Sequence, residues 1–260
     1  MQKIIHVMRR IVLLVVALAF AGCASVLDPT KDWTDEEFYN DAKNLLDNER
    51  YEDAIKRYEQ LQGRFPYGRY AEQSQLDIAY AYFRFEEPAL ALSACDRFIR
   101  QYPTHPNVDY AYYLKGYITF PSKYSVVNWL FRIDDDLHDR DIKGSREAYD
   151  AFKELVQRFP QSRYAEDAKL RMDYLFQSQA RHEVSVARYY YDRGAYVAAV
   201  NRTKHALENF PRTPAIEDAL AVQAMSYKKM GITKLFDDTL RVLKLNFPQS
   251  RYLEEISRLG

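Results

Sequence analysis

The chain has 260 residues, with 37 basic and 37 acidic side chains that give a formal net charge of zero. This balance gives no reason to expect a nucleic acid or an anionic membrane surface as the partner. Only eight glycines stand beside 22 tyrosines, a composition that favours close-packed helices over a turn-rich sheet protein.

The first 22 residues are predicted to be an export signal peptide. An apolar stretch runs over residues 11–20, two small residues follow it, and three basic residues precede it: Lys3, Arg9 and Arg10. Ten apolar residues are too few to span a bilayer, so the segment indicates a removable signal rather than a transmembrane helix. Cleavage would leave 34 basic against 37 acidic residues, a net charge of −3.

Cys23 is predicted to be the first mature residue and the point of lipid attachment. A cysteine at this position resembles the bacterial lipoprotein box, in which the thiol receives diacylglycerol and the new amino group is acylated. Several acyl chains anchor stably, since each buried methylene contributes about 0.8 kcal/mol. Ala24 resembles the residue found in Gram-negative lipoproteins sent to the outer membrane. We expect attachment to its periplasmic face through a tether at 23–34, with no other cofactor and no metal; the alternative is a soluble exported protein with an unmodified Cys23.

Residues 35–260 are predicted to form an all-α, tetratricopeptide-like superhelix of five helix-turn-helix units. Each unit closes with an aromatic residue and a proline: Phe65-Pro66, Tyr102-Pro103, Phe159-Pro160, Phe210-Pro211 and Phe247-Pro248. Small residues recur at twelve-residue steps before these pairs, as close approach of paired helices requires: Ala42, Ala54, Ala79, Ala91, Ala148, Ala187, Ala199 and Ala224. Such units must stack to bury their apolar faces. We expect N-caps at Ser162, Thr213 and Ser250.

Two irregularities interrupt this spacing. Gly116 and Ala148 lie 32 residues apart instead of twelve, which indicates an insertion at about 119–141 in the third unit. Fourteen extra residues before Ala187 indicate one long helix over 163–191, because fourteen residues make nearly four turns and restore the same face. The long helix would couple units one to three, at 35–160, to units four and five, at 161–260.

No catalytic constellation is visible in the sequence. The five histidines form no metal-binding spacing, and no glycine-rich phosphate loop or nucleophile elbow occurs. The acidic run at 134–141 lacks the glycine and the final glutamate of a calcium loop, so a solvated insertion is expected. Cys95 stands where the repeat packs an apolar residue, which favours a buried thiol over a nucleophile. Binding without catalysis is therefore expected.

One face of each unit's first helix is expected to line a concave groove. In the front half this face is aromatic and comprises Tyr39, Leu76, Tyr80, Phe83, Tyr110, Tyr113, Tyr117 and Phe120. In the back half it is mixed and more basic, and includes Arg188 and Tyr191. Aromatic stripes on helices are often core. A groove for an extended peptide is the other interpretation, because tyrosine rings supply contact area while their hydroxyls stay wet.

The chain also resembles the BamD (ComL) family, the tetratricopeptide lipoproteins of the outer-membrane β-barrel assembly machinery. The specific segments lie at 97–100, 103–110, 139–141, 185–190 and 193–202, and the Thr104-His105-Pro106-Asn107 turn is especially distinctive. The resemblance implies a scaffold that helps unfolded outer membrane proteins to fold and insert.

The resemblance also implies partners. The back half would bind the POTRA domain of BamA, with Arg202 as a charged contact and Arg188 and Tyr191 on the same interface. The front groove would receive unfolded outer membrane β-barrel proteins, and other Bam lipoproteins would dock alongside. Another periplasmic repeat lipoprotein, such as a secretin pilotin or a cell-wall synthesis coordinator, is the alternative.

Overall fold

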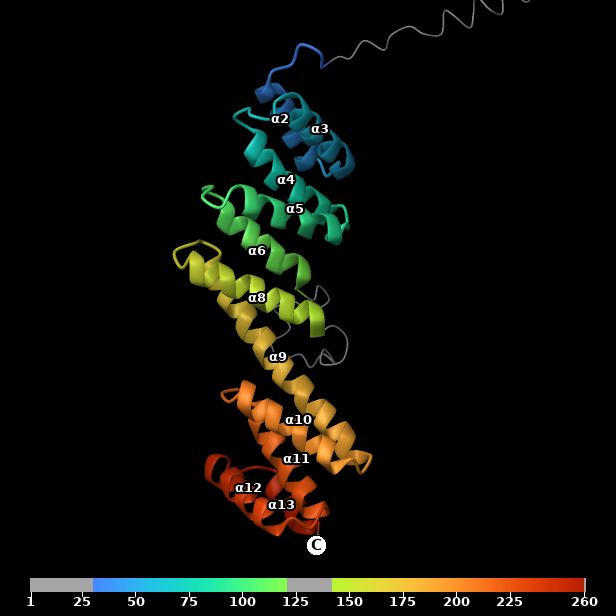
Figure 1. Cartoon of the computed structure of the whole chain (residues 1–260), viewed down its shortest axis with the longest axis vertical. Helices are drawn as coiled ribbons and strands as arrows, with labels where there is room; N and C mark the ends of the chain where they lie inside the picture. Colours follow the sequence, from blue (N-terminus) through green and yellow to red (C-terminus); the bar gives the residue numbers. More distant parts are fainter. Residues whose placement is uncertain (1–29, 121–141, 260) are drawn as a thin grey trace, which may run out of the picture.

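The computed structural model describes residues 30–120 and 142–259. All regular secondary structure in this part of the chain is α-helical (Figure 1). Cys23, most of the tether at 23–34 and nearly all of the insertion predicted at about 119–141 lie outside the described residues. The helices are α2 (Asp35–Asp47), α3 (Tyr51–Arg64), α4 (Ala71–Arg84), α5 (Pro88–Gln101), α6 (Val108–Thr119), α8 (Ile142–Arg158), α9 (Ala165–Asp192), α10 (Tyr196–Asn209), α11 (Ala215–Lys229), α12 (Thr233–Asn246) and α13 (Tyr252–Arg258).

The helices pack against their neighbours in chain order, which builds an elongated stack rather than a globule (Figure 1). The five pairs are α2/α3, α4/α5, α6/α8, α9/α10 and α11/α12. All eight alanines of the repeat pattern are fully buried, as expected where a methyl group is all that fits between paired backbones. The prediction of an all-α, tetratricopeptide-like repeat fold is confirmed.

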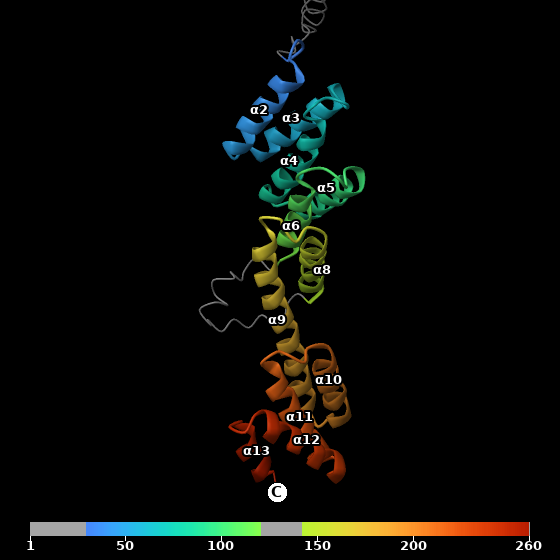
Figure 2. The same cartoon turned by 90° about the vertical axis from the view of Figure 1, so that its left-hand side faces the viewer.

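The long helix α9 joins the two halves of the stack. Its first part supplies Ala168, Tyr174 and Leu175 to the core cluster of the third unit. Its last part supplies Ala180, Val184 and Ala187 to the cores of the back half. Figure 2 shows α9 running from α8 to α10 without a break. One continuous helix thus belongs to both cores, close to the range 163–191 expected from the spacing.

The turns between units share one geometry. In the first turn the carbonyl of Phe65 accepts from the Gly68 amide at 2.9 Å, and the Gly68 carbonyl accepts from Ala71 at 3.0 Å. The same pattern recurs from residue 159 and from residue 247. The arginine of each of these turns lies over the ring of the tyrosine that follows it: Arg69 on Tyr70, Arg163 on Tyr164 and Arg251 on Tyr252.

None of the three predicted N-cap residues is the N-cap itself: Tyr164 and Arg251 take that position in α9 and α13, and neither helix has a side-chain cap hydrogen bond. The hydroxyl oxygens of Ser162 and Ser250 accept from the amides of Tyr164 and Tyr252 at 3.2 and 3.3 Å, at the entrances of α9 and α13. The N-cap prediction for Thr213 is wrong, because its hydroxyl donates backwards to the Phe210 carbonyl at 3.0 Å. Pro214 occupies the cap position of α11 instead.

Cys95 is the buried core thiol that the repeat position predicts. Its side chain is fully buried in α5, packed with Ala79, Ala94 and Leu114. Burial raises the pKa of this thiol to about 12. Because the thiolate is the reactive form, Cys95 is inert in the folded protein.

Candidate functional site

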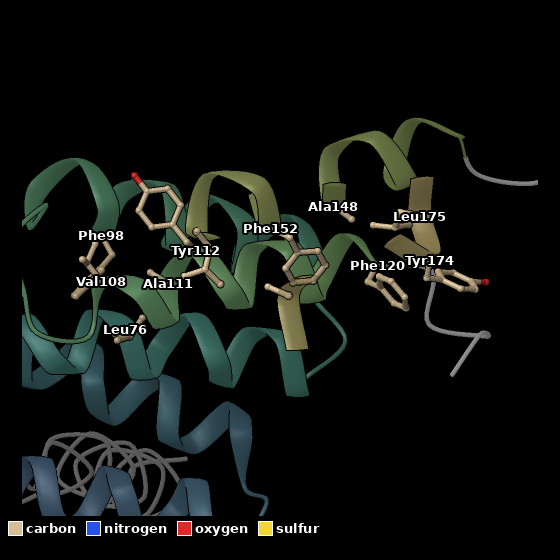
Figure 3. Packing of buried hydrophobic residues seen from close by; sticks show 12 residues of the cluster. Leu76, Phe98, Val108, Ala111, Tyr112, Phe120, Ala148, Phe152, Tyr174 and Leu175 are labelled. Carbon is tan, nitrogen blue, oxygen red and sulfur yellow. The ribbon is translucent and has the colours of Figure 1, made fainter. Parts of the chain in front are cut away.

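Two of the eight predicted front-groove residues are core residues, and their assignment to the groove is wrong. Leu76 is 1% exposed and belongs to the core cluster that also holds Phe98 and Val108. Phe120 is 6% exposed and packs against the rings of Phe152 and Tyr174 (Figure 3). The physical reason is stacking: a helix inside the array has neighbours on both sides, so part of its inner face is covered by the next unit.

Two of the predicted groove tyrosines, Tyr39 and Tyr113, connect successive units through a hydrogen bond and a ring stack. Tyr39 donates its hydroxyl to Asp77 at 3.0 Å and stacks on Tyr70 with ring centroids 4.6 Å apart. Tyr113 occupies the same repeat position, donates to Asp167 at 2.7 Å and stacks on Tyr164 at 4.8 Å. The rings are half-buried. Each of these two tyrosines is therefore partly a core residue and partly a groove residue, because part of its ring is packed and part is accessible.

A front aromatic surface remains accessible, which we define as Tyr80, Phe83, Tyr110, Tyr113 and Tyr117. Tyr117 is 40% exposed, and the others are half-buried. Phe83 meets Tyr117 edge to face at 5.6 Å, and Tyr117 lies 6.0 Å from Tyr113. These rings come from α4 and α6, so the surface spans the second and third units.

Arginines border the front aromatic surface. Arg171 of α9 lies over the Tyr117 ring at 4.9 Å and pairs with Asp167. Arg84 donates to the Tyr80 hydroxyl at 2.8 Å. Aromatic residues and arginine are among the residue types that are enriched at protein interfaces. The arrangement can hold apolar side chains of an extended segment and a nearby carboxylate.

Asp77 is a polar centre between the first two units. Its carboxylate accepts from Gln73 at 2.8 Å, from Tyr39 at 3.0 Å and from Tyr58 at 3.3 Å. Burial raises the pKa of Asp77 more than these hydrogen bonds lower it. The folded state thus binds a proton at this carboxyl more tightly than the unfolded state does.

This linkage predicts a pH dependence of stability. A raised pKa of an acid in the folded state means that its contribution to stability is present below the unfolded pKa and is lost as pH rises through the folded pKa. For Asp77→Asn we therefore expect the wild type to lose free energy of unfolding relative to the variant as pH rises from about 4, until the pH exceeds the raised pKa of Asp77 in the folded state. Urea unfolding of both proteins across this pH range measures it. A difference that does not change with pH would contradict the assignment.

The back half contains one buried charge that the sequence reasoning missed. Glu183 of α9 is 4% exposed, and it is the only charged side chain that is buried within 30–120 and 142–259. Its Oε2 lies 3.1 Å from Nη1 of Arg202 and 3.5 Å from Nδ1 of His205, both on α10. The sequence did indicate this burial, because Glu183 stands between Ala180 and Ala187 at helical spacing and so faces the core.

Arg202 is held at the surface by this buried carboxylate. Its side chain is 45% exposed, and the hydrogen bond to Glu183 uses one of the five N–H donors of the guanidinium. The other donors can serve a carboxylate of a partner without breaking the pair. The ion pair thus fixes the direction in which Arg202 points.

The structure does not bring Arg188 and Tyr191 to Arg202. Arg188 lies over the Tyr252 ring of α13 at 5.5 Å, and Tyr191 packs on Tyr196 at 5.6 Å. Arg188 follows Glu183 by five residues, so the two side chains leave α9 about 140° apart.

Among the described residues, no helix is both long and apolar enough to cross a membrane. Comparison with solved structures gives overlaps with MamA, at 14% identity, 83% of this chain, 96% of that chain and a TM-score of 0.33, and with a putative kinesin light chain of Podosopora anserina at the same TM-score. The helix order and stacking described above, rather than these overlaps, establish the fold.

Relatives identify the family. The family model described as outer membrane lipoprotein (YfiO) matches residues 31–243. The chain is 46% identical to outer membrane protein assembly factor BamD of Neisseria meningitidis, over 95% of both chains. It is 36% identical to BamD of Vibrio cholerae, over 90% of this chain and 96% of the relative. This chain belongs to the BamD family of outer membrane protein assembly factors.

Proposed function

We propose that this protein is a non-enzymatic scaffold of the β-barrel assembly complex, anchored by lipid on Cys23 to the periplasmic face of the outer membrane. The back half holds a POTRA domain of BamA, the front half receives unfolded outer membrane proteins, and other Bam lipoproteins dock alongside. Membership in the BamD family supports this over a pilotin or a cell-wall coordinator.

The front aromatic surface is the observation that carries the substrate-binding part. Five rings from two adjacent units stay partly accessible although their neighbours Leu76 and Phe120 are fully packed. Aromatic rings held by packing lose little conformational entropy on binding, which makes them efficient anchors. An extended segment that ends in aromatic side chains could lay its rings against Phe83 and Tyr117.

For Tyr117→Ala we expect about tenfold weaker binding of a peptide from the C-terminal strand of an outer membrane protein, since an interface aromatic contributes about 1–2 kcal/mol. The fold should change little, because Tyr117 is 40% exposed. Fluorescence anisotropy with a labelled peptide measures the affinity. Tyr189→Ala is the control, as Tyr189 is 53% exposed in the back half. Equal affinities for both variants and the wild type would contradict the assignment.

A further inference from the structure

The turn at the end of the first unit, residues 65–70, carries a fully exposed aromatic residue; we call this turn the tip. Tyr67 is 100% exposed, more than any other large hydrophobic side chain in the described residues. It stands one residue after Pro66, in the turn between α3 and α4. In the other four units this position holds a polar residue: Thr104, Gln161, Arg212 or Gln249. At 100% exposure the Tyr67 ring adds no packing to the fold and is accessible to something outside the chain.

The turn holds Tyr67 rigidly. Pro66 precedes it, and the Gly68 amide donates to the Phe65 carbonyl at 2.9 Å. A Cβ added at Gly68 would lie 3.0 Å from the Phe65 Cβ and 3.1 Å from Oδ2 of Asp35. The turn is therefore pressed against the start of α2, and Tyr67 is presented from a fixed backbone.

The same end of the unit receives the N-terminal tether. Arg64 donates from Nη1 to the carbonyl of Thr30 at 2.5 Å and to that of Lys31 at 3.4 Å. Trp33 packs edge to face on Phe38, and Arg57 lies over the Trp33 ring at 4.9 Å. The chain is thus fixed to the first unit from Thr30 onward, next to the turn that carries Tyr67.

The anchor proposed at Cys23 is close in sequence to this fixed point. Thr30 lies seven positions after Cys23, and seven residue steps of extended chain reach at most about 25 Å. The third unit's turn, at Arg163, lies four helix layers further along the stack, or roughly 32–40 Å away at 8–10 Å a layer. A bilayer that holds the lipid of Cys23 is therefore within reach of the tip, and the turn at Arg163 lies beyond the reach of the tether from Thr30.

We propose that Tyr67 contacts the bilayer interface and orients the first unit on the membrane. This inference rests on the lipid anchor of the proposed function. Tyrosine suits such a position, because its ring enters the headgroup region while its hydroxyl stays hydrated. The tether supplies a high effective concentration, so one weak contact suffices.

The contact is apolar rather than electrostatic. Near the tip, the cations Lys31, Arg64 and Arg69 are outnumbered by the carboxylates of Asp32, Asp35, Glu36, Glu37 and Glu72. An acidic surface is not attracted by anionic lipid. The contact should therefore form on zwitterionic vesicles and be insensitive to salt, whereas an electrostatic one would weaken.

Position-specific fluorescence on the full lipoprotein in phosphatidylcholine vesicles tests this. Arg69→Cys and Arg163→Cys occupy the same position of equivalent turns, and each is labelled with an environment-sensitive dye; Cys95 is buried and Cys23 is lipidated in the mature protein. We expect a blue shift and quenching by spin-labelled lipid at position 69, neither effect at position 163, and no change in high salt. Adding Tyr67→Ser should remove the effects at position 69.

Equal signals at positions 69 and 163, or a position-69 signal that Tyr67→Ser leaves intact, would overturn the membrane contact. A signal at position 69 that needs an added protein partner instead of vesicles would also overturn it. Mass spectrometry of the mature protein distinguishes failure of the Tyr67 contact from failure of the lipid anchor. Lipid on Cys23 without quenching refutes only the Tyr67 contact, whereas an unmodified Cys23 refutes the anchor and the contact together.

Discussion

Gly116→Ala is expected to lower the free energy of unfolding by about 1–3 kcal/mol, because it overfills the contact between α6 and α8. A Cβ at this position would lie 2.7 Å from Cδ1 and Cε1 of Phe152 and 2.9 Å from its Cζ. The ring cannot swing away easily, since Phe152 is fully buried and packs against Tyr113 and Phe120. Urea unfolding of the protein without its lipid anchor measures the loss of free energy of unfolding.

Gly63→Ala is the matched control for this variant. Gly63 also lies in a helix, α3, but a Cβ there meets nothing within 4 Å. Alanine should raise stability at this site by about 0.5–1 kcal/mol, because it restricts the unfolded chain and favours the helix. Adding Phe152→Leu to Gly116→Ala should cost less than the two single losses combined, because the smaller side chain makes room. Strict additivity would show that the clash is not the cause.

Arg202→Glu is expected to weaken both the fold and the proposed grip on BamA. Breaking a fully buried ion pair costs about 3–5 kcal/mol; Arg202 is half exposed, so we expect about 2 kcal/mol from the unpaired carboxylate of Glu183 and its new acidic neighbour. Binding to a BamA POTRA fragment should fall at least tenfold, since a charged contact that becomes repulsive costs more than one that is merely lost. Unfolding and titration calorimetry measure the two effects.

Two further variants separate these effects. Glu183→Gln keeps the shape of the buried side chain and leaves Arg202 in place, so it should lower stability while BamA binding changes only a few-fold. Arg212→Glu makes the same charge change at an exposed turn of the back half and should change neither quantity much. If Glu183→Gln abolishes binding as completely as Arg202→Glu does, Arg202 acts through the fold and is not a contact residue.

The fold was predictable because it depends on spacing alone. Small residues at twelve-residue steps, and prolines that close each second helix, follow directly from the geometry of paired helices. The length of α9 followed from the same reasoning, because fourteen added residues keep the helical face in register.

The site was predictable only in part, because exposure depends on neighbours that lie far away in the sequence. Tyr117 and Leu76 share the expected face of their helices, yet Tyr117 remains exposed while the next unit covers Leu76. Helical spacing cannot distinguish these cases. Glu183 was overlooked because acidic residues are rarely buried, and its partner Arg202 lies on another helix. Arg188 was placed by its position on the groove face and Arg202 by the family resemblance, and their contacts lie on different helices: Arg188 lies over Tyr252 of α13, and Arg202 pairs with Glu183 of α9.

The central claim is that one stack holds BamA with its back half and unfolded outer membrane proteins with its front half. Photo-crosslinking in living cells tests it most directly, with the crosslinking amino acid placed at Tyr80 or Tyr117 in front and at Arg202 behind. We predict that the front positions capture newly exported outer membrane proteins and that position 202 captures BamA. The same partner at both ends, or BamA at Tyr80 and Tyr117 alone, would contradict the account.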